Sequence, residues 1–148
     1  MAASGKSVEW TANLLWTILM IAPVLYLALP AAVLLGHQGL ARDQSIIPNL
    51  FLGFLAVSAV NVVLVYYTQT SAGFMSRMTR ISLSRDRGAF QVFSLGMIIV
   101  ETFSIYGLVL TLLSGSLFYG FGFSIAAWTG LVLVRIRFKQ NMADIPKK

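Results

Sequence analysis

Glu101 is the residue whose chemistry most needs an explanation in this sequence. It stands about eleven residues after Phe90 and twelve before Leu113, within a predominantly apolar stretch. An ionised carboxylate at the middle of a bilayer costs at least ~2.5 kcal/mol, and the neutral acid costs less to bury. No Lys, Arg or His is expected at the same depth. The sequence therefore predicts a protonated Glu101, which makes this residue a candidate proton carrier.

Three polar residues of other apolar stretches are expected at the depth of Glu101, given a rise of 1.5 Å per helical residue. They are Ser58, Asn61 and Ser124. We predict a small polar, ion-binding layer in which Glu101 donates a hydrogen bond to Asn61 or to a serine. Such a layer has two interpretations, because a protonated Glu can also act as a structural hydrogen bond between helices, worth roughly 0.6 kcal/mol.

The elements that must position these residues are transmembrane helices. The chain has 148 residues, of which 57% are apolar and 11% charged, and its mean hydropathy is +0.80. This is more apolar than soluble proteins, and the apolar residues gather in runs of roughly twenty, the length that crosses a bilayer. The runs are Trp10–Leu35, Ile46–Thr68, Phe90–Leu113 and Leu117–Val134. We predict one all-α membrane domain of four transmembrane helices.

The distribution of Lys and Arg predicts the orientation of these helices, because basic residues are retained on the cytoplasmic side. Ten of the eleven basic residues fall on one side of the predicted spans, and only Arg42 falls on the other. Both termini are therefore expected in the cytoplasm, and the chain in the plasma (inner) membrane. The alternative is that the first run is a cleaved signal peptide. Three spans would then remain, with the amino terminus outside.

The loop 69–89 is basic and carries apolar residues between its cations. Its four arginines are Arg77, Arg80, Arg85 and Arg87. A basic amphipathic turn of this kind is typical of segments that lie on anionic lipid at the inner leaflet. The alternative is a docking surface for a cytoplasmic partner.

Two features are typical of packing between membrane helices. Pro23 lies inside the first run, where we expect a kink. In the last run, Gly120 and Ser124 are four residues apart, as are Ala126 and Gly130. Small residues at this spacing let another helix approach closely, either from this chain or from another.

The composition excludes several classes of site. With no Cys and a single His, His37, the chain offers neither a disulfide nor a cysteine-ligated metal. No nucleophile paired with a base and no phosphate-binding loop is present. We therefore expect no cofactor and no catalytic activity. We also expect no binding of nucleic acid, because the net charge of +6 is explained by membrane topology. The alternative, a haem or chlorin with His37 as its single axial ligand, predicts a coloured protein.

The segment from Glu101 to Leu113, ETFSIYGLVLTLL, resembles the carboxylate-bearing helix of the proteolipid (c) subunits of rotary ATPases. The resemblance implies that Glu101 binds H⁺ or Na⁺. It covers about twenty residues, and this chain departs from the family in its long basic loop, in a second span with Gly53 as its only glycine, and in the orientation of its termini. The sequence is also similar to four-span bacterial membrane proteins with a comparable third helix, a similarity that implies no activity.

Two functions follow as hypotheses. The first is a small non-catalytic accessory subunit of a larger membrane complex, in which Glu101 binds a proton or joins helices. The second is a proton- or ion-translocating membrane protein, either a monomer or an oligomer, that uses Glu101 as proteolipids do. The expected partners are lipid and either other membrane subunits or further copies of this chain.

Overall fold

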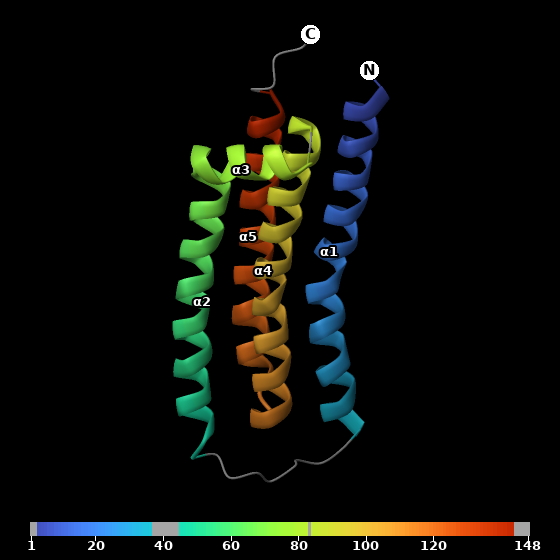
Figure 1. The fold of residues 1–148 in the computed structure, drawn as a ribbon. Coiled ribbons are helices and arrows are strands. Elements are labelled where there is room, and N and C mark those ends of the chain that lie inside the picture. The colour runs from blue at the N-terminus through green and yellow to red at the C-terminus, as the bar shows by residue number, and fades with distance from the viewer. Residues whose placement is uncertain (1–2, 37–44, 83, 144–148) are drawn as a thin grey trace.

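Five helices make up the part of the chain that the computed structural model describes, residues 3–36, 45–82 and 84–143. They are α1 (Ala3–Gly36), α2 (Ile47–Thr70), α3 (Ala72–Ser82), α4 (Arg85–Ser114) and α5 (Leu117–Ala143). α1, α2, α4 and α5 are each long and apolar enough to cross a membrane. They stand side by side, whereas α3 lies across one end of the bundle (Figure 1). The predicted all-α membrane fold with four spanning helices is confirmed.

α4 is the central helix of the bundle. It packs against each of the other four helices, and α5 is the neighbour that it contacts most extensively. The two helices form a tight hairpin, because α4 ends at Ser114 and is followed by Gly115, whose φ of 70° lies in the left-handed region that glycine adopts without strain. α1 and α2 cover α4 from outside and expose most of their large apolar side chains. In a bilayer, these exposed side chains contact lipid.

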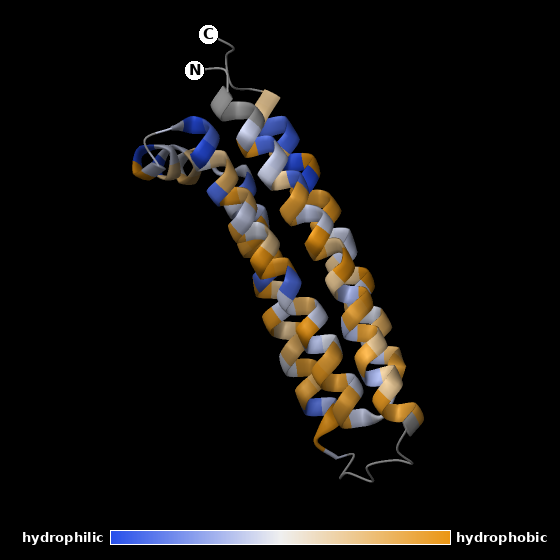
Figure 2. Cartoon of the chain, turned by 90° about the vertical axis from the view of Figure 1, so that its right-hand side faces the viewer, coloured by the Kyte–Doolittle hydropathy of each residue, from blue (hydrophilic) through white to orange (hydrophobic). Residues whose placement is uncertain are grey.

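The hydrophilic residues gather at one end of the molecule. They colour α3 and the adjoining ends of the long helices blue, while the shafts are mostly hydrophobic (Figure 2). The start of α1, the end of α5 and α3 share this end (Figure 1). An even number of spans therefore returns the chain to the side on which it begins, as the sequence predicts.

Two predicted boundaries need correction. The segment 69–89 was expected to be a loop with an amphipathic turn, but most of it is helical: α2 continues to Thr70, α3 follows, and α4 begins at Arg85. The apolar span predicted at Leu117–Val134 lies within a longer helix, α5, which continues to Ala143. Both differences have one physical reason. Hydropathy indicates where the chain leaves the bilayer, whereas a helix continues for as long as its backbone hydrogen bonds do.

α3 is attached to the start of α4 by a close contact. A Cβ on Gly88 would lie 2.9 Å from the backbone of Thr79, so only glycine allows the two backbones to approach this closely. The arginines of this region remain exposed. They are Arg77, Arg80, Arg85 and Arg87.

The small residues of α5 separate into two groups. Gly120 and Ser124 are buried, and a Cβ on Gly107 of α4 would lie 3.3 Å from the Gly120 backbone. These residues set the distance between α4 and α5. Gly130 also meets α4, whereas Ala126 is exposed on the side facing α2.

Pro23 and Pro30 lie inside α1, which is nevertheless one continuous helix. Both prolines are buried. A proline removes one backbone donor from the preceding turn. Pro23 leaves the Leu19 carbonyl without its usual donor. The carbonyl of the next residue, Met20, accepts a hydrogen bond of 3.0 Å from the indole Nε1 of Trp128 in α5. This bond ties α1 to α5 in the proline-containing region.

Candidate functional site

Glu101 lies near the middle of α4, between two residues that face other helices. Val100 faces α5, since a Cβ on Gly130 would lie 2.7 Å from its Cγ1 atom. Thr102 faces α2, where its Oγ1 atom accepts a hydrogen bond of 3.1 Å from Asn61 Nδ2. Successive residues of a helix are 100° apart. Glu101 therefore projects toward a third side of α4, the side against which α1 packs.

The Glu101 side chain occupies the edge of the interface between α1 and α4. On one side of it along the helix surface, Met97 and Ser104 are fully covered. On the other side, Ile98 and Ile105 are 64% and 42% exposed. Glu101 itself is 9% exposed. The carboxyl group is thus buried, but it lies next to exposed apolar side chains of α4.

The carboxyl oxygens of Glu101 are buried without hydrogen-bond partners among the described residues. The same holds for the hydroxyl oxygens of Ser94, Ser104 and Thr111. These four residues follow one another at intervals of seven, three and seven, which keeps them on one face of a helix. We call this row of Ser94, Glu101, Ser104 and Thr111 the polar seam. Natural proteins pair the large majority of buried polar atoms, so this row is a candidate for binding a proton, a water molecule or a polar group of another subunit.

The helices that pack against α4 also place buried N–H donors without partners inside the bundle. They are Trp16 Nε1 on α1 and Arg135 Nη1 on α5, again considering only the described chain. The Arg135 guanidinium lies over the Trp16 ring, 5.7 Å from its centroid, in a cation–π contact. Arg135 is five residues from Gly130, a distance of about 7.5 Å along the helix toward the α3 end. It forms no hydrogen bond with Glu101.

The predicted polar layer is not assembled around Glu101. Asn61 has the expected depth but donates to Thr102, the neighbour of Glu101 that faces α2. Ser58 lines an apolar groove between α2 and α5, and Ser124 is buried on α5. Neither serine is hydrogen-bonded to Glu101, whose carboxyl oxygens are unpaired. The rise per residue predicts depth correctly, but a shift of one residue turns a side chain by 100° and so changes the helix that it meets.

Sequence reasoning missed the residues that accompany the α2 side. Thr102 was not identified as the acceptor for Asn61, and Gln69 was not expected to be buried. Its Nε2 atom donates to the Val92 carbonyl of α4 at 2.8 Å. A usable signal existed, since Asn61 and Gln69 are eight residues apart, about 80° around the helix, and so lie on the same side of it. Two amides on one side of an apolar helix indicate the face that meets another helix.

The chemistry open to this site is the binding of a proton. A carboxyl group that is buried without a cation or hydrogen-bond donor is held more cheaply in its neutral form. Within the described ranges, no three His, Cys, Asp or Glu residues gather as metal ligands would. His37, the alternative axial ligand, lies outside the described residues.

Comparisons of the chain with protein families, with curated protein sequences and with solved structures found no match.

Proposed function

We propose that this chain is a small, non-catalytic subunit of a larger membrane complex, in which Glu101 holds a proton inside the bundle. The observation that carries the proposal is the Glu101 carboxyl itself, buried at the centre of a spanning helix with both oxygens unpaired within the described structure. An unpaired buried polar group costs about 1–3 kcal/mol of stability. Sequences retain such a cost most readily where the group has a function.

The accessory role is supported by how little of the described chain lies outside the four long helices. Residues 3–36, 45–82 and 84–143 form four long apolar helices and the short helix α3, so this described part offers little chain outside a bilayer to carry a reaction of its own. The expected role is therefore to supply a titratable group and helical surfaces to an assembly.

We further propose that the α3 end faces the cytoplasm. The support is the clustering of basic residues at this end, together with the rule that such residues stay on the cytoplasmic side. The exposed arginines of α3 and early α4 would then face the inner leaflet and bind anionic lipid; they are Arg77, Arg80, Arg85 and Arg87.

Native mass spectrometry of the complex extracted from its own membrane in mild detergent tests the accessory role. We expect other polypeptides to accompany this chain at a fixed stoichiometry. The variant Glu101→Gln keeps the size and neutral charge of the protonated side chain, so it should assemble normally and change only the proton-dependent property of the complex. Recovery of this chain alone would contradict the accessory role.

The alternative function, translocation of protons or other ions, is favoured by the position of Glu101 at the edge of the α1–α4 interface. Because exposed Ile98 and Ile105 adjoin it, a small movement of α1 or a second subunit could change what the carboxyl group faces. Proton flux into vesicles that contain the purified chain alone distinguishes the two functions. Translocation predicts a flux that Glu101→Gln abolishes, whereas an accessory subunit predicts no flux in either protein.

A further inference from the structure

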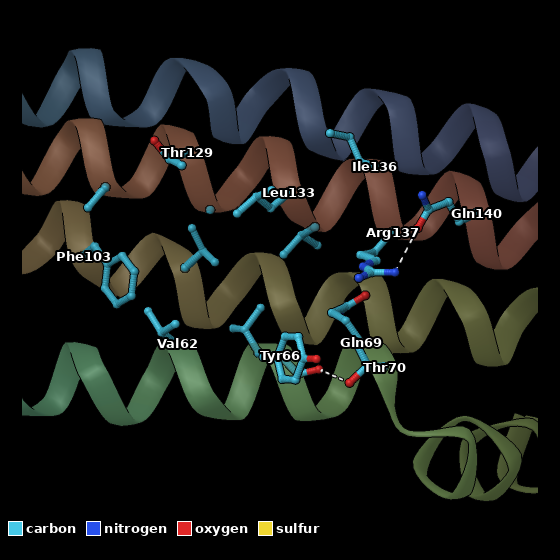
Figure 3. A pocket seen from close by; sticks show the side chains of 15 residues that line it. Val62, Tyr66, Gln69, Thr70, Phe103, Thr129, Leu133, Ile136, Arg137 and Gln140 are labelled. Carbon is cyan, nitrogen blue, oxygen red and sulfur yellow. Dashed lines mark hydrogen bonds between the residues drawn. The ribbon is translucent and has the colours of Figure 1, made fainter.

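A groove runs along the bundle between α2 and α5, on the side of α4 opposite to the interface with α1. α2 and α5 make few contacts with each other, and the space between them contains a cavity of about 690 Å³. Its lining is largely apolar and includes Val62, Val65, Phe103 and Leu133 (Figure 3). A volume of this size is within the range of sites for small ligands.

One end of the groove is polar. Tyr66, Gln69, Thr70, Arg137 and Gln140 lie together there, while Val62, Leu133, Phe103 and Thr129 follow the groove away from them (Figure 3). Arg137 is exposed and donates to Gln140 Oε1 at 3.1 Å. In the described part of the chain no carboxylate pairs with it. The Oε1 atom of Gln69 is buried without a partner, so this end offers both a cation and a polar side chain.

The length of the 690 Å³ cavity, the part of the groove with the polar end, matches one leaflet of a bilayer. Gln140 stands fourteen residues after Ala126 on α5, so the cavity is about 21 Å long, which is close to half of a bilayer of about 40–45 Å including its headgroups. The apolar part of α5 ends near Val134, so Arg137 stands at the level of the headgroups. A phospholipid has the same order of parts, an anionic phosphate at the surface and apolar chains below it.

We propose that this groove is a specific site for one anionic phospholipid, with its phosphate on Arg137 and an acyl chain along Val62, Leu133 and Phe103. The charge of Arg137 at the headgroup level identifies lipid as the occupant. An apolar helix from a second copy would leave this cation without a counter-charge. A second cavity of about 440 Å³ continues the groove toward the other end of the bundle and shares Val62, Phe103 and Ala126 with the first. The site differs from the arginines near α3, and the inference does not depend on a role for Glu101.

Native mass spectrometry of the purified, delipidated chain, titrated in detergent with phosphatidylglycerol or with phosphatidylcholine, tests the site. We expect one phosphatidylglycerol to bind with an affinity about tenfold higher than phosphatidylcholine. Both lipids offer an ionised phosphate to Arg137, but phosphatidylcholine also carries a choline ammonium, a like charge that opposes binding next to the guanidinium. Arg137→Gln should remove this preference. The matched control is Lys139→Gln, which removes an exposed cation from the same helix that does not line the groove.

A second pair of variants tests the acyl-chain part of the groove. Ala126→Phe places a ring inside it and should weaken binding of both lipids about tenfold, whereas Ile125→Phe changes a neighbouring exposed residue outside the groove and should have no effect. Equal binding of the two lipids, or equal effects of Arg137→Gln and Lys139→Gln, would overturn the proposal. So would a dimer that Ala126→Phe abolishes, because the groove would then be occupied by a second copy. Arg137 is exposed, so its variant gives an answer even if Ala126→Phe does not fold.

Discussion

On the face of α4 that meets α2, two side-chain hydrogen bonds join the helices: Thr102 accepts from Asn61, and Gln69 donates to the Val92 carbonyl. On the face that meets α1, Glu101 and Ser104 are buried without partners in the described structure. The same helix therefore has one face where hydrogen bonds between side chains and the neighbouring helix form, although Gln69 Oε1 stays unpaired there, and another where the carboxyl group of Glu101 forms none. The bonds account for the first face as packing, whereas they do not account for the buried carboxyl group.

The largest expected effect comes from forcing α4 away from α5, which would disturb both faces together. Gly107→Val places a branched side chain where a Cβ alone would lie 2.9 Å from Phe123 Cβ and 3.3 Å from the Gly120 backbone. We expect a loss of about 3 kcal/mol in the free energy of unfolding, because overpacking of a tight contact has costs of this order. Denaturation by SDS in bicelles measures the change.

The control for this change is Gly122→Val, which makes the same substitution in α5 where a Cβ would meet nothing within 4 Å. Its effect on unfolding should be small. If the two variants were destabilised equally, the helix propensity of valine and not the α4–α5 contact would be the cause.

The next largest effect separates the two faces by sign. Glu101→Leu replaces an unpaired carboxyl with an apolar side chain of similar size, so we expect it to stabilise the bundle by about 2 kcal/mol, the cost of one buried unpaired polar group. The same unfolding measurement applies. A destabilised Glu101→Leu protein would mean that the carboxyl group makes a favourable interaction and that the two faces of α4 do not differ as described.

The smallest effect belongs to the paired face. Asn61→Leu removes the bond to Thr102 and should destabilise the bundle by about 0.6 kcal/mol, the average for hydrogen bonds between membrane helices. The loss is small because the Thr102 hydroxyl also donates to the Ile99 carbonyl at 2.7 Å. Adding Thr102→Val to Asn61→Leu should then cost little more. A second loss of equal size in the double variant would show that Thr102 acts independently of Asn61.

Much of the fold can be predicted from the sequence. The bilayer, and not the neighbours of each helix, determines how long an apolar run must be and on which side Lys and Arg are placed. Spans, their number and the shared side of the termini follow in this way. The helical state of α3 and the length of α5 do not, since hydropathy reports where a chain leaves the bilayer and not where its hydrogen bonds end. Arg135 illustrates the difference, as it belongs to α5 but lies beyond the apolar run.

The candidate site was predictable in depth and not in direction. Glu101 and Asn61 share a level in the bundle, as the rise per residue predicts, yet Asn61 meets Thr102. Direction depends on which helix lies on which side of α4, and no local pattern contains that information. The unpaired state of Glu101 was for this reason not foreseen, and it is the strongest indication that the residue has a function.

The protonation state of Glu101 at neutral pH tests the central claim most directly. Infrared difference spectroscopy between the wild-type protein and Glu101→Gln, both in lipid nanodiscs, reports the carbonyl stretch of a protonated carboxyl group separately from the bands of a carboxylate. The matched control is Glu9→Gln, because Glu9 is exposed near the N-terminal end of α1. We predict a protonated-carboxyl band that Glu101→Gln removes and Glu9→Gln retains. Loss of carboxylate bands in the Glu101→Gln protein, with no protonated band in the wild type, would contradict a proton held at Glu101.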